Sequence, residues 1–201
     1  MKFSTRQLVT LAVFGTLWGV VEMSFGSVLK SLQIPFSGAV LASIGLLIVM
    51  VARLFVPVRG SSLFVGVIAM LLKLFSIGTI IIGPMFGIVT EAILAELVFS
   101  STRRQNRALF VLVGGLGVLW TLAQPFVTGL LFFGRAPFVV WLDMIDNGAR
   151  MLGLSGQVIW LVLAALVAVH LILGGVAGWL AWDVGRQLQK RMGQTLEYSG
   201  A

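Results

Sequence analysis

Five ionisable side chains interrupt long apolar stretches of the sequence, where a charge is costly and is usually paired or functional. They are Glu22, Lys73, Glu91, Glu96 and His170. At the helical rise of about 1.5 Å per residue, Glu22, Lys73 and Glu91 each lie roughly 10–12 Å inside the same predicted face of a membrane. We therefore expect these three to share one layer. Because one lysine cannot neutralise two carboxylates, the surplus acid must be protonated, hydrated or matched by a cationic ligand.

An amide and two indoles are predicted near the same layer. Gln124 lies close to its level, and Trp120 and Trp160 could stack on a flat ligand or make cation–π contacts. One interpretation is a polar pocket open to the outside, lined by Glu22, Lys73, Glu91, Gln124, Trp120 and Trp160. The other is a structural Lys73–Glu pair that lets helices pack, with both tryptophans against lipid or core.

Catalytic chemistry is not predicted. Glu96 and His170 are expected at similar depth in the inner half, as a hydrogen-bonded pair or facing the cytoplasmic water layer, with a proton relay as the alternative. Ser155 would lie roughly 22 Å along the helix from His170, too far for a nucleophile–base pair. The sequence has no cysteine, no phosphate-binding glycine loop and no His-Glu-x-x-His motif. We therefore predict neither an enzyme nor a cofactor or metal site.

The elements that must position these side chains are predicted to be transmembrane helices. Hydrophobic residues make up 59% of the chain and charged residues only 10%, whereas soluble domains carry about 25% charged residues. Crossing a bilayer takes about 20 mostly apolar residues in a helix. The sequence predicts one all-α membrane domain over 1–201 with six spans: 7–29, 38–57, 61–81, 84–101, 108–133 and 157–183.

Two predicted outer connections could cover the pocket. The shorter is 31–38, between the first two spans, and the longer is 134–156, between the last two. The longer segment mixes Trp141 with Asp143 and Asn147, which is typical of an interfacial or capping segment rather than a soluble domain. The break between the third and fourth spans is placed at Gly83-Pro84, since proline ends one helix and suits the first turn of the next.

Basic residues near the span ends predict the orientation, because they favour the cytoplasm. The net charge of +7 does not indicate nucleic-acid binding, since the basic residues lie in short clusters between apolar stretches. Ten lie on one predicted side and three on the other, which favours both termini in the cytoplasm. The ten are Lys2, Arg6, Arg53, Arg59, Arg103, Arg104, Arg107, Arg186, Lys190 and Arg191, and the three are Lys30, Arg135 and Arg150.

Small residues four apart allow two helices to approach closely. The first span carries two such pairs, Ala12 with Thr16 and Gly15 with Gly19, and the last span carries Gly174 with Gly178. These pairs serve either packing within the molecule or the docking of a partner helix.

A local pattern runs from Arg59-Gly60-Ser61 to Arg103. It includes Ile82-Gly83-Pro84-Met85-Phe86-Gly87-Ile88-Val89-Thr90-Glu91 and Ala95-Glu96-Leu97. With this pattern, the chain resembles the substrate-binding S components of energy-coupling factor (ECF) vitamin transporters, nearest to those for thiamine or its hydroxymethylpyrimidine precursor. The resemblance covers most of the chain: its size, the six spans, the orientation and the long outer segment before the last span.

The resemblance implies a prokaryotic plasma-membrane protein that captures a vitamin for an importer. The vitamin would bind near the outer surface under the 31–38 loop, in a pocket that adds the 141–150 segment with Trp141, Asp143 and Asn147. A transmembrane coupling protein driven by two ATPases would dock on the first span. The docking residues would be Ala12, Gly15, Thr16 and Gly19. A membrane scaffold and a proton-coupled carrier using Glu96 and His170 are the alternatives.

Overall fold

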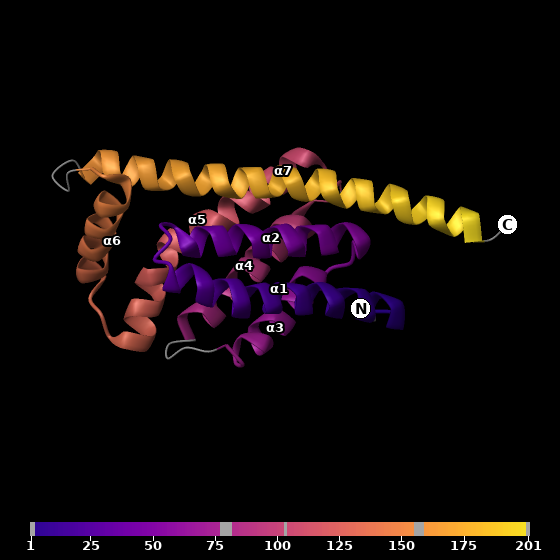
Figure 1. Cartoon of the computed structure of the whole chain (residues 1–201), viewed down its shortest axis with the longest axis horizontal. Helices are drawn as coiled ribbons and strands as arrows, with labels where there is room; N and C mark the ends of the chain where they lie inside the picture. Colours follow the sequence, from indigo (N-terminus) through magenta and orange to yellow (C-terminus); the bar gives the residue numbers. More distant parts are fainter. Residues whose placement is uncertain (1–2, 77–81, 103, 155–158, 200–201) are drawn as a thin grey trace.

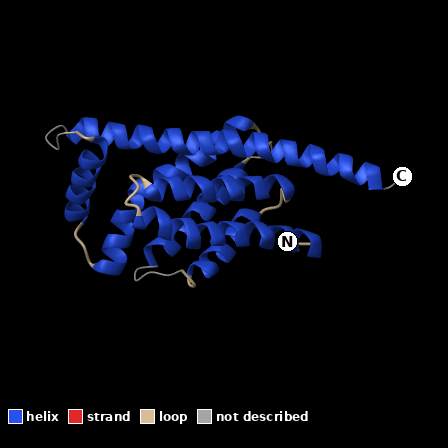
Figure 2. Ribbon diagram, in the orientation of Figure 1, coloured by secondary structure: helices blue, strands red, loops and turns tan. Residues whose placement is uncertain are grey.

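The computed structural model is a helical bundle, and it describes residues 3–76, 82–102, 104–154 and 159–199 (Figures 1 and 2). No strand occurs among these residues. The helices are α1 (Thr5–Ser31), α2 (Ser37–Phe55), α3 (Ser61–Lys73), α4 (Ile82–Ser101), α5 (Arg107–Phe133), α6 (Pro137–Leu152) and α7 (Ile159–Ser199).

Five helices, α1, α2, α4, α5 and α7, are long and apolar enough to cross a membrane. The all-helical, membrane-embedded architecture agrees with the sequence prediction, but the six-span count is not confirmed. The predicted span 61–81 corresponds to α3, which has 13 residues and ends at Lys73. The rest of that predicted span includes 77–81, which lies outside the described residues. The sixth crossing and the sidedness of the termini therefore stay predictions.

The outer segment 134–156 contains a helix that the sequence analysis did not predict. Pro137 stands in the first turn of α6, where its missing N–H leaves no helical hydrogen bond unmade. Gly153 follows the helix with a positive φ of 65°, a conformation that glycine adopts without steric cost. Trp141 and Met144 of α6 pack against a small core that Ile145 and Ala149 form with α7. The segment is thus a helical cap on α7.

Helix α2 is the centre of the bundle, and it packs against α1, α3, α4, α5 and α7. Its sequence has no charged residue before Arg53 and is mostly apolar all round, which is typical of a helix surrounded by others. Leu46, Val49 and Met50 are fully buried. Helix α6 is the one described helix that does not contact α2.

Glycines set the closest helix contacts. A Cβ on Gly15 would lie 2.7 Å from Ile68 Cβ, and one on Gly19 would lie 2.7 Å from Leu72 Cβ, both on α3. Gly174 approaches the backbone of Gly114 on α5 in the same way. The prediction that Gly15 and Gly19 form an outward docking face is therefore wrong, because these residues are buried between α1 and α3.

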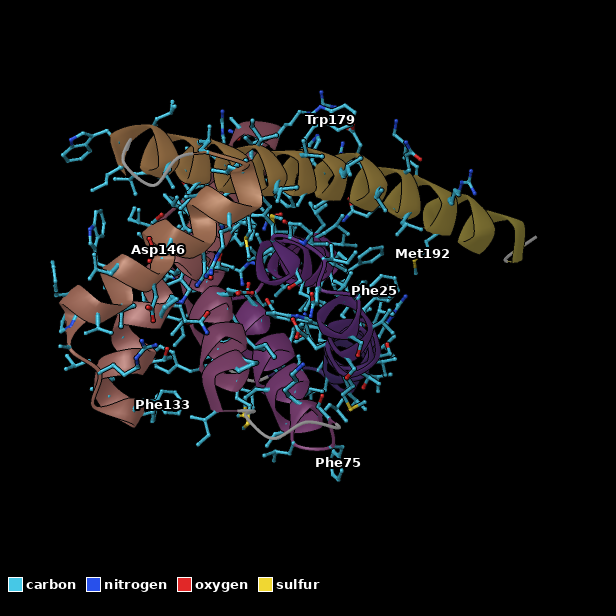
Figure 3. The ribbon with its side chains drawn as sticks, turned by 60° about the vertical axis from the view of Figure 1, so that its left-hand side comes forward. Phe25, Phe75, Phe133, Asp146, Trp179 and Met192 are labelled. Carbon is cyan, nitrogen blue, oxygen red and sulfur yellow. The ribbon has the colours of Figure 1, made fainter. Side chains whose placement is uncertain are left out.

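The outer surface of the bundle is apolar. Phe25, Phe75, Phe133 and Trp179 point away from the helices (Figure 3), and Phe75 is 77% exposed. Exposed aromatic and aliphatic side chains over this much of a surface suit lipid rather than water.

Helix α6 lies across one end of the bundle, whereas the other six helices alternate in direction along the chain, so α1 begins and α7 ends at the opposite end from α6 (Figure 1). The α1–α2 connection and the first turn of α4 lie at the same end as α6. Helix α7, with 41 residues, extends past the other helices at the end where the termini lie.

Candidate functional site

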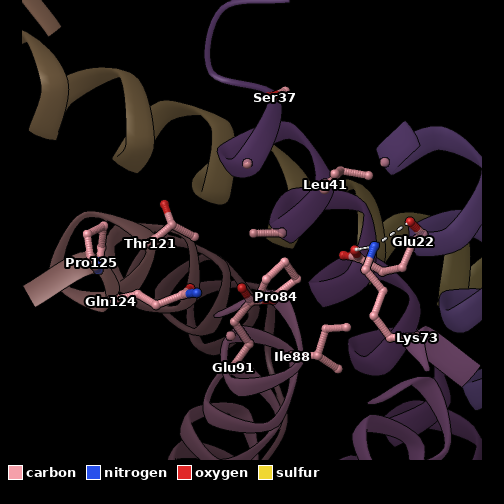
Figure 4. A pocket seen from close by; sticks show the side chains of 14 residues that line it. Glu22, Ser37, Leu41, Lys73, Pro84, Ile88, Glu91, Thr121, Gln124 and Pro125 are labelled. Carbon is pink, nitrogen blue, oxygen red and sulfur yellow. Dashed lines mark hydrogen bonds and ion pairs between the residues drawn. The ribbon is translucent and has the colours of Figure 1, made fainter. Parts of the chain in front are cut away.

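A cavity of about 220 Å³ opens among the helices at the end opposite the termini (Figure 4). Its position follows from the residues that border it: Ser37 begins α2, Lys73 ends α3, and Pro84 lies in the first turn of α4. Four residues that the sequence analysis assigned to one layer line this cavity, each from a different helix. They are Glu22 of α1, Lys73 of α3, Glu91 of α4 and Gln124 of α5.

Lys73 and Glu22 form a buried ion pair on one wall. Lys73 Nζ lies 3.2 Å from Glu22 Oε2 and donates a second hydrogen bond of 2.7 Å to the main-chain oxygen of Glu22. Gly26 makes room for the ammonium group, since a Cβ there would lie 3.2 Å from Nζ. The lysine is therefore committed to Glu22, and its charge is balanced within the pair.

Glu91 lines the same cavity without such a partner. The residue is 5% exposed, its Oε2 is sealed from solvent, and no hydrogen bond or ion pair reaches its carboxyl group from the described part of the chain. An unpartnered buried polar group costs of the order of 1–3 kcal/mol, and more when it is charged. Glu91 is thus the group in the cavity that a bound molecule would satisfy.

Gln124 ties α5 to the start of α4. Its Nε2 donates a 2.8 Å hydrogen bond to the main-chain oxygen of Gly83. Its amide group packs closely against Gly87, where a Cβ would be 2.6 Å from Oε1. The predicted break at Gly83-Pro84 therefore lies on the border of the cavity, with α4 beginning at Ile82.

A second cavity of about 370 Å³ adjoins the first, because Ser37, Gly38, Thr121 and Pro125 border both. Its other walls come from the α1–α2 connection, α6 and α7. They include Phe36, Asp143, Asn147 and His170.

Three polar residues of the second cavity have partners of their own. Asp143 pairs with Arg135, and Asn147 accepts a 2.6 Å hydrogen bond from Arg150. His170 Nδ1 lies 2.7 Å from the oxygen of Leu166. The predicted site residues Asp143 and Asn147 therefore line the second cavity and not the first cavity, which Glu91 lines.

None of the predicted tryptophans lines either cavity. Trp160 is 79% exposed on the outer surface of α7, and Trp120 is half-buried outside the cavity walls. Trp141 packs in the contact between α6 and α7. The prediction that Trp120 and Trp160 face the pocket is wrong, because depth along a helix does not determine the direction in which a side chain points.

Glu96 and His170 do not form a pair. Glu96 accepts hydrogen bonds from Arg53 (3.2 Å), the Gly60 and Ser62 amides (2.8 and 3.0 Å) and Ser100 (2.6 Å). His170 instead packs its ring edge-on against Phe36, near the second cavity. The predicted pair and the alternative proton relay are thus not present, and Glu96 anchors the start of α3 to α4.

Sequence reasoning missed Ser37 and Thr121 at the junction of the cavities, and the role of Arg53. Single hydroxyl residues in an apolar stretch give almost no signal, since they often bond to their own helix, as Thr121 does to Val118. The role of Arg53 could have been predicted, because this charged residue lies inside the apolar stretch, two residues before the end of α2.

Comparisons of the chain with protein-family models, with curated proteins and with solved structures find no match.

Proposed function

We propose that this chain is the substrate-capturing membrane subunit of an ECF-type importer, and that it binds a vitamin or related small nutrient without catalysing a reaction. The observation that carries the proposal is the cavity of about 220 Å³ with Glu91 buried and unpartnered at its wall. Intramembrane ionisable residues that face a cavity commonly mark a substrate path. A bundle that bound nothing would gain stability by replacing this carboxyl group with an apolar side chain.

The proposed orientation places the cavity on the outer face of a prokaryotic plasma membrane. Arg6, Arg59, Arg107 and Arg186 all lie at the end of the bundle that carries the termini. Basic residues favour the cytoplasmic side, so both termini would be cytoplasmic and the cavity would face the outside.

The proposed partners are a transmembrane coupling protein and two ATPases, because the sequence has no phosphate-binding loop of its own. With Gly15 and Gly19 buried, the surface of α1 left for the coupling protein is aliphatic. It consists of Val9, Val13, Leu17 and Val20, with Thr16 exposed beside them and Ala12 half-buried.

A vitamin panel tests the proposal. The protein, purified in detergent, would be melted with each vitamin, and a ligand that binds only the folded state raises the melting temperature. At a hundredfold excess over Kd the gain is about 2.7 kcal/mol. We expect at least one vitamin to raise the melting temperature, and the double variant Glu22→Gln/Glu91→Gln to lose this response.

The control is Asp146→Asn, the same chemical change at an exposed carboxyl outside both cavities. This variant should respond as the unmodified protein does. A panel without any shift would reject the capture function.

The remaining alternative is a non-catalytic scaffold, and the buried Lys73–Glu22 pair favours it, since such a pair can serve helix packing alone. If the chain is a scaffold, the double variant should change the melting temperature of the protein without ligand. No vitamin should then change the melting temperature of the unmodified protein.

A further inference from the structure

The charges around the first cavity do not balance. Glu22 and Lys73 neutralise each other at 3.2 Å, which leaves the carboxyl group of Glu91 in excess. Lys73 also donates to the main-chain oxygen of Glu22 at 2.7 Å, so a move toward Glu91 would break two interactions. An ionised Glu91 therefore needs a positive charge from outside the chain.

Hydrogen-bond acceptors also outnumber free hydrogen-bond donors on the walls of the first cavity. Gln124 uses Nε2 to donate to Gly83, and its oxygen receives no hydrogen bond from the described residues. Thr121 donates its hydroxyl hydrogen to Val118, which leaves only lone pairs toward a ligand. Together with Glu91, these groups favour a molecule rich in N–H donors.

The site consists of two adjoining cavities that differ in charge. The first cavity, at about 220 Å³, is smaller than the 300–1,000 Å³ or so that is usual for ligand pockets, and its other walls include Leu41 and Ile88. Past Ser37 and Thr121 the second cavity, of about 370 Å³, contains Asp143, which already has Arg135 as its partner. Only the first cavity therefore has an unmatched charge.

We propose that the ligand carries one positive charge on a nitrogen with N–H donors, as an ammonium, an amidinium or a protonated amino-heterocycle, that this end binds Glu91, and that an uncharged remainder extends past Ser37 and Thr121. This inference rests on the proposed capture function and specifies the chemical class of what is captured. Glu91 is the specificity residue, and the Lys73–Glu22 pair keeps the positive charge of Lys73 away from it.

Matched pairs of small molecules test the charge directly. Benzamidine and benzamide have nearly the same shape, as do benzylamine and benzyl alcohol, but only the first of each pair is a cation. Binding would be measured by thermal shift and calorimetry at constant ionic strength. A charge-assisted hydrogen bond favours the cation, so we expect it to bind roughly 10- to 100-fold more tightly than its neutral partner.

Two variants locate the effect. Glu91→Gln keeps the shape of the side chain and removes its charge, so it should reduce the preference for the cation to within about threefold. Asp146→Asn should keep the full preference. Glu91→Gln should itself remain folded, with an equal or higher melting temperature, because it no longer buries an unpaired carboxyl group.

Three results would overturn the charge assignment: no binding by either cation, equal binding of cation and neutral partner, or an unchanged preference in Glu91→Gln. A vitamin that still raised the melting temperature in the panel would then leave the capture function standing. Failure of the vitamins as well would reject both proposals.

Discussion

Two carboxylates on the same helix, Glu91 and Glu96, have opposite environments. Glu96 accepts hydrogen bonds from a guanidinium, a hydroxyl and two amides at the start of α3. A helix start has free N–H groups and a positive dipole end, which suit a carboxylate. Glu91, little more than one helical turn earlier, has no partner among the described residues. The first arrangement holds the fold together, and the second is open to a ligand.

Replacing Glu96 tests the structural half of this contrast. Glu96→Ala leaves Arg53 buried without its anion, and the loss of one member of a buried pair costs about 3–5 kcal/mol. We expect a large fall in the melting temperature, which would be measured by tryptophan fluorescence. Ser100→Ala is the matched control on the same helix, since it removes one neutral donor and should cost about 1 kcal/mol. Equal effects of the two changes would contradict a central role for the Arg53–Glu96 pair.

At the scale of single residues, the estimated depth was right for three ionisable side chains and wrong for His170, which lies beside the second cavity. Glu22, Lys73 and Glu91 meet because a fixed rise per residue places them at one level. Trp160 fails the same reasoning, since it lies in the first turn of α7 and is exposed on the outer face of that helix. Glu96 was assigned to His170 because the two were estimated to lie at similar depth, whereas the anionic partner of Arg53 is Glu96.

At the scale of the helices, α5 and α7 cross at a point where both helices have glycines. A Cβ on Gly174 would lie 2.6 Å from the carbonyl carbon of Gly114 and 2.9 Å from Gly115 Cα. Both are backbone atoms, which cannot rotate aside as a side chain can. The two helices must therefore separate if either glycine gains a side chain.

Gly174→Ala should thus destabilise the protein by about 1–3 kcal/mol, the usual range for overpacking. Gly83→Ala is the control, because a Cβ there meets nothing within 4 Å. Thermal unfolding of both variants in the same detergent provides the comparison. If Gly174→Ala melted no lower than Gly83→Ala, the glycine contact would not be what holds α5 against α7.

The start of α4 carries a sequence signal and was predicted, whereas the end of α3 carries none and was missed. The start of α4 follows from Gly83-Pro84. The end of α3 at Lys73 could not be predicted, because Leu74 and Phe75 continue the apolar stretch. Helix α6 was missed because it is amphipathic rather than uniformly apolar, although Pro137 and Gly153 mark its two ends.

For the whole molecule, the arrangement of the helices places the two free ends of the chain at one end of the bundle and the cavities at the other. The molecule thus has one basic end and one end that holds the two cavities. Which end faces the cytoplasm decides whether the chain can capture a nutrient from outside.

Cysteine labelling tests that orientation, and the chain suits it because it has no cysteine of its own. Ala136 is exposed before α6, and Thr102 is exposed after α4. We expect a membrane-impermeant maleimide to label Ala136→Cys in intact cells and Thr102→Cys only after the membrane is opened. A permeant maleimide should label both and serves as the control. The reverse pattern would place the cavity in the cytoplasm, and labelling of both from outside would contradict the path of the chain.

The length of α7 has a mechanical consequence. As one unbroken helix of 41 residues it is roughly 60 Å long, about twice the thickness of the hydrocarbon layer. One of its ends packs against α6 beside the second cavity, and the other stands clear of the bundle. The glycine contact with α5 lies at Gly174, so a tilt of about 10° around that contact would carry the free end of α7, 25 residues further along the chain, through roughly 6 Å. A small change in the angle between α5 and α7 would therefore become a much larger sideways displacement of the end that stands clear of the bundle.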